Sequence, residues 1–75
     1  MSRDDRIRET IKSRLIECRK ANNLSQTEVG KLVGKSKNAV ASWEQGLSLP
    51  DLITLYQLAN YYGKTLDYMY GDAEE

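Results

Sequence analysis

Two helix-start signals flank a tight turn in the middle of this chain, and they constrain its fold more than any other feature. Ser25 is followed three residues later by Glu28, which is the pattern of a capping box. Gly34 is placed to end that helix, and Ser36 is placed to cap the next one. The sequence therefore predicts two short helices joined by a glycine-containing turn, a helix-turn-helix over about residues 25–45. The apolar residues expected on their inner faces are Val29, Leu32, Val33, Val40 and Trp43.

The segment before Ser25 carries a single apolar stripe. Its members recur at intervals of four, four and three residues: Ile7, Ile11, Leu15 and Cys18. This spacing predicts a helix over about residues 4–21. Asn22 and Asn23 would end it, because Asn tolerates the left-handed backbone of a helix end. Cys18 is interpreted as a buried core thiol rather than a redox sensor.

Two further helices are expected after Pro50. Asp51 would cap the first and Thr65 the second, and a glycine follows each. The side chains expected to face inward from the first are Leu52, Leu55, Leu58, Ala59 and Tyr62. Because no segment alternates with the period of a strand, the expected fold is all-α, a compact five-helix bundle over residues 1–71. Residues 72–75 are expected to be an acidic tail or the start of a linker.

The charges of the chain are unevenly distributed although their sum is zero. Residues 1–42 carry ten Lys/Arg against five Asp/Glu, a net charge of +5, whereas residues 43–75 carry one Lys against six Asp/Glu, a net charge of −5. Such polarity is typical of a protein with a basic face for a polyanion and an acidic face turned away. An ordinary solvated surface with an accidental asymmetry is the alternative, and charge alone does not separate the two.

Several function classes are excluded or disfavoured by composition. One cysteine and no histidine allow neither an internal disulfide nor a Cys/His zinc site within one chain. No apolar run approaches the ~20 residues that cross a bilayer, and the N-terminus lacks a signal-peptide pattern, so a cytoplasmic protein is expected. No nucleophile–base pair, phosphate-binding glycine loop or metal-ligand set is evident, which predicts no catalytic residues, no cofactor and no metal. Trp43 could stack on single-stranded bases, but its spacing from Val40 favours the core.

Taken in register, these features resemble the phage-repressor and Cro-like helix-turn-helix family, also called the Xre family. The residues that carry the resemblance are Gln26-Thr27-Glu28-Val29-Gly30, Gly34, Val40, Trp43-Glu44-Gln45-Gly46, Pro50, Leu58-Ala59, Gly63 and Thr65-Leu66-Asp67. It covers roughly residues 10–71. The resemblance implies a lambda-repressor-like fold and a bacterial or phage transcriptional repressor. Such a protein docks its third helix, here about residues 37–45, in the major groove of a double-stranded DNA operator as a dimer.

The resemblance also implies which residues contact DNA. The predicted base contacts are Lys37, Asn38, Ala39 and Ser42. Lys suits the O6/N7 edge of guanine, Asn pairs with adenine, and the Ala methyl suits thymine. The predicted phosphate contacts are Gln26, Lys35, Ser36, Gln45 and Arg19. Any of these side chains could instead be an ordinary solvated surface residue.

Three departures from the family pattern bear on these assignments. Lys35 stands where the family usually has an apolar residue, and Gly30 replaces the commoner Ala. The loop of residues 47–49 lacks the Lys/Arg often found before the proline, which removes the phosphate contacts that such residues would make.

Self-association and other partners are less sharply defined by the sequence. Tyr and Met crowd into the last fifteen residues, and Tyr is enriched at interfaces, so Tyr61, Tyr68 and Tyr70 are candidates for a dimer interface. Half-exposed tyrosines are also common on ordinary surfaces. The alternative function is an antitoxin-type module whose main partner is a toxin or another protein antagonist. The chain is interpreted either as a complete small regulator or as the DNA-binding part of a longer repressor.

Overall fold

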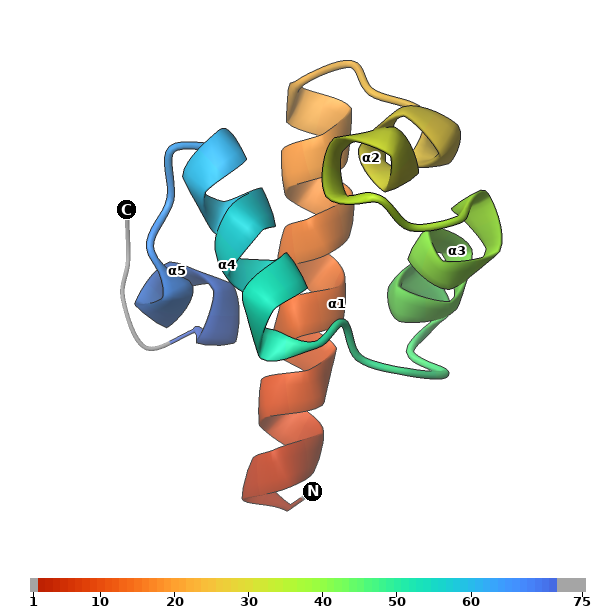
Figure 1. Cartoon of the computed structure of the whole chain (residues 1–75). Helices are drawn as coiled ribbons and strands as arrows, with labels where there is room; N and C mark the ends of the chain where they lie inside the picture. Colours follow the sequence, from red (N-terminus) through yellow and green to blue (C-terminus); the bar gives the residue numbers. More distant parts are fainter. Residues whose placement is uncertain (1, 72–75) are drawn as a thin grey trace.

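Five helices connected by short turns make up the described part of the chain. The computed structural model describes residues 2–71 (Figure 1). The helices are α1 (Arg3–Ala21), α2 (Gln26–Val33), α3 (Lys37–Gln45), α4 (Leu52–Tyr61) and α5 (Leu66–Tyr70). Within residues 2–71 no strand is present, which confirms the all-α prediction. The predicted acidic tail, residues 72–75, lies outside the described residues.

The helix boundaries agree with the capping residues predicted from the sequence. The side chains of Ser25, Ser36, Asp51 and Thr65 each accept a hydrogen bond from the backbone N–H three residues further on. Glu28 completes the capping box, because its carboxylate accepts from the backbone N–H of Ser25 at 2.8 Å. These bonds satisfy backbone donors that have no partner inside the helix, so they fix where each helix starts.

The end of α1 shows the backbone conformation that its sequence predicts. Asn23 has a φ of +56°, in the left-handed region that Asn tolerates better than most residues. At the other end, α1 starts one residue earlier than expected, because Ser2 acts as an additional cap and accepts from the N–H of Asp5. Figure 1 shows α1 as the central helix, with α2 and α3 on one side and α4 and α5 on the other.

The core forms between the inner faces of the five helices. It comprises the buried side chains of Ile11, Leu15, Cys18, Val29, Val40, Trp43, Leu55, Leu58, Ala59, Tyr68 and Met69. The core assignments of Cys18, Val40 and Trp43 are thereby confirmed. None of the helices within residues 2–71 is both long and apolar enough to span a membrane.

Two residues predicted to face inward are exposed instead. Leu52 is 63% exposed, because Thr54 occupies the inner face of α4 in its first turn. Leu32 is 44% exposed, because the buried face of α2 is centred on Val29 and Gly30 and leaves Leu32 at its edge. Both sequence assignments were wrong for the same reason: a helical stripe predicted from apolar residues alone was drawn too wide.

Gly30 has a packing role that explains why no larger residue stands there. A Cβ atom at this position would collide with the backbone carbonyl oxygen of Lys35 in the turn that follows α2. The backbone N–H of Lys35 donates to the carbonyl oxygen of Gly30 at 2.8 Å, which holds the turn against the helix. This close approach sets how the chain enters α3.

Candidate DNA-binding surface

The outward face of α3 is polar, and its inward face is packed into the core. Lys37, Asn38 and Gln45 are exposed and Ser42 is half-buried. Spacings of four and three residues place Asn38, Ser42 and Gln45 on one side of the helix. Val40, Trp43 and Glu44 are buried on the other side. The helix therefore presents hydrogen-bonding side chains on a rigidly seated support.

Ala39 is less available than the other predicted base-contact residues. It is half-buried and packs against the core beside Val40. The methyl group that was expected to meet a thymine is therefore partly covered by the protein itself. Ser42 is also engaged, because its Oγ lies 2.8 Å from the Oγ of Ser48 in the loop after α3.

The N-terminus of α3 is suited to anions. Ser36 caps it by accepting from the N–H of Ala39 at 3.1 Å, which leaves the hydroxyl hydrogen of Ser36 able to donate. Its first turn holds no acidic residue, and Lys35 and Lys37 flank the cap. The partial positive charge of the helix end and the two ammonium groups therefore act in the same direction.

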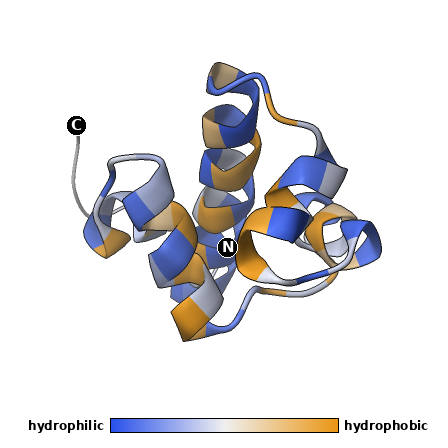
Figure 2. Cartoon of the chain, turned by 45° about the horizontal axis from the view of Figure 1, so that its top comes forward, coloured by the Kyte–Doolittle hydropathy of each residue, from blue (hydrophilic) through white to orange (hydrophobic). Residues whose placement is uncertain are grey.

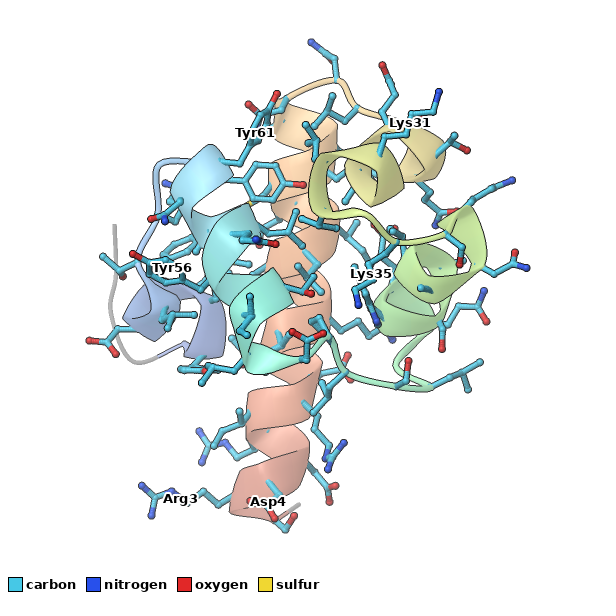
Figure 3. The ribbon with its side chains drawn as sticks, in the orientation of Figure 1. Arg3, Asp4, Lys31, Lys35, Tyr56 and Tyr61 are labelled. Carbon is cyan, nitrogen blue, oxygen red and sulfur yellow. The ribbon has the colours of Figure 1, made fainter. Side chains whose placement is uncertain are left out.

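Lys35 is held near the start of α4 by an exposed ion pair. Its Nζ lies 3.6 Å from the Oδ2 of Asp51, and Figure 3 shows the side chain between α3 and α4. Exposed pairs of this kind contribute only ~0–1 kcal/mol. Lys35 can therefore leave Asp51 for a DNA phosphate with little loss of free energy.

Arg19 has a structural role that the sequence did not predict. Its Nε and Nη2 donate to the two carboxylate oxygens of Glu44 at 2.7 and 2.9 Å, and its Nη1 donates to the carbonyl oxygen of Leu24 at 3.0 Å. Only 16% of the Arg19 side chain and 7% of the Glu44 side chain are exposed. The hydrogen bonds to Glu44 raise the pKa of Arg19. Three of the five guanidinium N–H groups thus donate within the protein, which gives Arg19 a structural role beside the predicted phosphate contact.

The same carboxylate also holds Gln26 at the start of α2. The Nε2 of Gln26 donates to the Oε1 of Glu44 at 3.2 Å. A side-chain amide nitrogen carries two hydrogens, so the second remains able to donate outward. Arg19, Gln26 and Glu44, here named the Glu44 network, thus link α1, α2 and α3. Sequence patterns did not reveal this network, because its members lie 18 and 25 residues apart.

Lys12 is a basic residue near this surface that sequence reasoning did not single out. Its aliphatic chain lies beside Gly46, where a Cβ atom would be 3.5 Å from the Cδ of Lys12. Its ammonium group is 3.7 Å from Glu9, an exposed pair on the same helix. Lys12 therefore brings positive charge from α1 to the C-terminal end of α3.

The tyrosines proposed for a dimer interface differ in exposure. Tyr61 is 52% exposed, and Tyr70 is half-buried against the core. Tyr68 is only 8% exposed, because Arg14 and Lys64 cover its ring at 4.1 and 4.7 Å from the ring centroid. Arg14 also donates from Nε to the carbonyl oxygen of Tyr68 at 3.1 Å. Tyr68 is therefore a core residue, and its assignment to an exposed interface was wrong.

The other side chains that could take part in chemistry already have structural roles. Burial raises the pKa of the Cys18 thiol, so the thiol stays protonated in the core. The carboxylate of Glu44 is held in its ion pair with Arg19. Over residues 2–71, no three Cys, Asp or Glu side chains lie close enough together to hold a metal ion.

Comparisons with known proteins agree with this geometry. A helix-turn-helix family model, HTH_3, matches residues 15–69. The chain is similar to the cryptic phage CTXphi transcriptional repressor RstR of Vibrio cholerae, with 32% identity over 62 residues, which are 83% of this chain and 56% of that protein. The chain thus spans about half the length of this curated relative. It is also similar to the P22 c2 repressor protein, whose crystal structure holds it in complex with synthetic operator 9T in the presence of Tl+. That match has a TM-score of 0.76 and 27% identity, and it covers 84% of this chain and 96% of the other.

Proposed function

Because the chain belongs to the helix-turn-helix family, we propose that it is a sequence-specific double-stranded DNA-binding regulator, a repressor that docks α3 in the major groove of an operator. The observation that carries the proposal is the polar outward face of α3, with Lys37 and Asn38 exposed on its first turn. The similar proteins support it, since one is a phage transcriptional repressor and the other is a repressor in complex with an operator. Residues 1–71 would form the DNA-binding domain.

Base recognition in this proposal falls to the first turns of α3. Lys37 donates to the O6/N7 edge of a guanine, and Asn38 makes a bidentate pair with an adenine. Ser42 and Ala39 are less available for base contacts, because Ser42 is hydrogen-bonded to Ser48 and Ala39 is half-buried. Repression follows if the bound protein covers a promoter and excludes the polymerase.

Phosphate contacts in this proposal position the domain rather than specify the sequence. Gln26 donates its second amide hydrogen from the start of α2, while the Glu44 network fixes the direction of that amide. Ser36, Lys35 and Gln45 contribute around α3, and Lys12 adds charge at its far end. Arg19 contributes through the Glu44 network, because three of its five N–H groups donate within the protein.

A dimer is part of the proposal because one α3 reads only one half-site. Two copies would then occupy half-sites about 34 Å apart on a two-fold symmetric operator. Of the three tyrosines considered, Tyr61 is the one with most of its side chain available for a contact between copies.

The test of this proposal is a selection of bound sequences from a random duplex pool, repeated over a series of salt concentrations. We expect enrichment of a two-fold symmetric motif and binding that weakens steeply as salt rises, because phosphate contacts release counterions. Gln26→Ala should weaken binding to all recovered sites about equally. Failure to enrich any motif would contradict the proposal and would favour a protein-interaction role such as that of an antitoxin.

A further inference from the structure

The exposed side of the first turns of α4 is apolar, although the rest of the described surface is rich in charge. Leu52, Ile53 and Tyr56 are 63%, 70% and 54% exposed, and Leu49, just before the helix, is 40% exposed. These four residues are here named the α4 patch. The first turn of α4 is coloured as hydrophobic in Figure 2, and Figure 3 shows Tyr56 directed away from α1. None of the four is needed by the DNA contacts proposed above.

The α4 helix carries no charged residue along its entire length. Its ten residues, LITLYQLANY, contain no Lys, Arg, Asp or Glu, in a chain where 29% of residues are charged. A two-fold interface places the same patch of each copy against itself, so any net charge on it would repel its own image. An uncharged face that combines aliphatic and Tyr side chains avoids this repulsion, and such depletion of charge is typical of interface cores.

The position of the α4 patch links it to α3. The patch begins within the loop that leaves the C-terminal end of α3, and this loop is tied back to α3 by the hydrogen bond between Ser42 and Ser48 (Figure 1). Lys35, at the N-terminal side of α3, forms its ion pair with Asp51 at the edge of the patch. A contact made through the patch would therefore fix the relative positions of the two α3 helices.

The size of the α4 patch fits an interface that forms on DNA rather than in free solution. Four side chains exposed by 40–70% present on the order of 400 Å² per copy. Two copies would bury about 800 Å² of patch surface, below the ~1,200–2,000 Å² of stable protein interfaces. Neighbouring half-sites supply the missing stability, because they hold the two copies at an effective concentration in the millimolar range.

We propose that the α4 patch is the surface through which two copies of this chain meet when they occupy adjacent half-sites. This inference rests on the proposed DNA-binding function for its setting, but the contact itself is between protein surfaces. Ile53, the most exposed member of the patch, contacts or closely approaches its counterpart in the second copy.

The test places opposite charges at this position in two separate variants, Ile53→Glu and Ile53→Lys. The probes are a duplex with both selected half-sites and a duplex with one half-site scrambled. Each variant alone should lose at least about tenfold of the cooperative occupancy of two half-sites, because like charges then face each other. A one-to-one mixture of the two variants should restore it. Binding to the single half-site should differ between the variants only by the general effect of added charge, which Ser13→Glu and Ser13→Lys on α1 measure as matched controls.

Sedimentation of the free proteins at millimolar concentration separates this inference from the DNA-binding proposal. The wild type should self-associate weakly, each Ile53 variant should sediment as a monomer, and the mixture should associate again. This readout decides the inference even if the wild type binds no selected duplex, a result that would sink the proposed function alone. Wild-type cooperativity and wild-type sedimentation in both Ile53 variants, with unchanged circular dichroism, would overturn the α4 patch as the contact between copies.

Discussion

The helix-turn-helix of α2 and α3 and the pair formed by α4 and α5 are held in place in different ways. The first is seated by buried Val29, Val40 and Trp43 and, in addition, by contacts with defined directions: the capping box, the close approach at Gly30 and the Glu44 network. The second is positioned mainly by buried apolar side chains, with Leu58 and Met69 fully covered. Hydrogen bonds and ion pairs fix direction, whereas burial is not directional. The half proposed to read DNA thus has the more directional supports.

The largest effect should come from truncating the apolar centre of the second half. Leu58→Ala should lower the free energy of unfolding by about 2–5 kcal/mol, because Leu58 is 0% exposed and the change leaves a cavity. Denaturant titration followed by circular dichroism measures this. Leu52→Ala on the same helix is the matched control and should cost well under half as much. Equal costs at both positions would mean that α4 is not seated as described.

Breaking the Glu44 network should have the next largest effect. Glu44→Gln should lower the free energy of unfolding by about 3 kcal/mol, because it leaves the largely buried guanidinium of Arg19 without a counter-charge. The double variant that combines Arg19→Met with Glu44→Gln should lose much less unfolding free energy than the two single variants lose in sum. Strict additivity in this double-mutant cycle would show that the pair contributes nothing as a pair.

The same variant sharpens the comparison between the two halves. If the Glu44 network positions Gln26, then Glu44→Gln should weaken DNA binding under conditions where the protein remains folded, whereas Leu58→Ala should not. Affinity measured well below the unfolding midpoint of each variant separates these cases. Equal losses of affinity in both variants would indicate a general effect of reduced stability.

Gly30→Ala should destabilise the fold by a smaller amount. In an exposed helix, Ala in place of Gly stabilises by ~1 kcal/mol. Here the added Cβ would collide with the backbone of Lys35, so we expect a loss of about 1–3 kcal/mol in the free energy of unfolding. Thermal unfolding checks this. A stabilised variant would show that the turn yields easily and does not constrain how α3 is entered.

The smallest effect should appear at alkaline pH, at Tyr62 just after α4. Burial raises the pKa of Tyr62, at the end of α4, from 10.0 to about 12. The neutral hydroxyl is favoured in the folded state, so its contribution is complete below the unfolded pKa and is lost as pH rises through the interval between these two values. Unfolding titrations across that interval should show a shallower loss of stability for Tyr62→Phe than for the wild type. Parallel curves would show that Tyr62 titrates no differently in the folded protein.

How much of this could be predicted from sequence depended on the range of the interactions. The helix boundaries were predictable because caps and glycines act within about four residues, as at Ser25 and Gly34. The helical spacing of apolar residues also found most of the core, although it could not place its edges, and Leu32 and Leu52 were assigned wrongly.

The supports of the candidate site could not be predicted in the same way. Arg19 looked like one more basic residue for a phosphate, and only the fold shows that Glu44 takes up its charge. Tyr68 looked like a surface tyrosine, and only the fold brings Arg14 and Lys64 over its ring. In both cases the partner lies far away in sequence or on another helix, where local periodicity carries no information.

The central claim is that the first turn of α3 reads base edges, and the most direct measurement is base-by-base discrimination by the Asn38→Ala variant. Affinities of wild type and variant would be compared on a selected site and on all of its single-base substitutions. We predict a loss of about 1–3 kcal/mol, with relaxed discrimination at one base pair and unchanged discrimination elsewhere. If Asn38→Ala discriminates at every position as the wild type does, α3 does not read DNA through its first turn and the account is wrong.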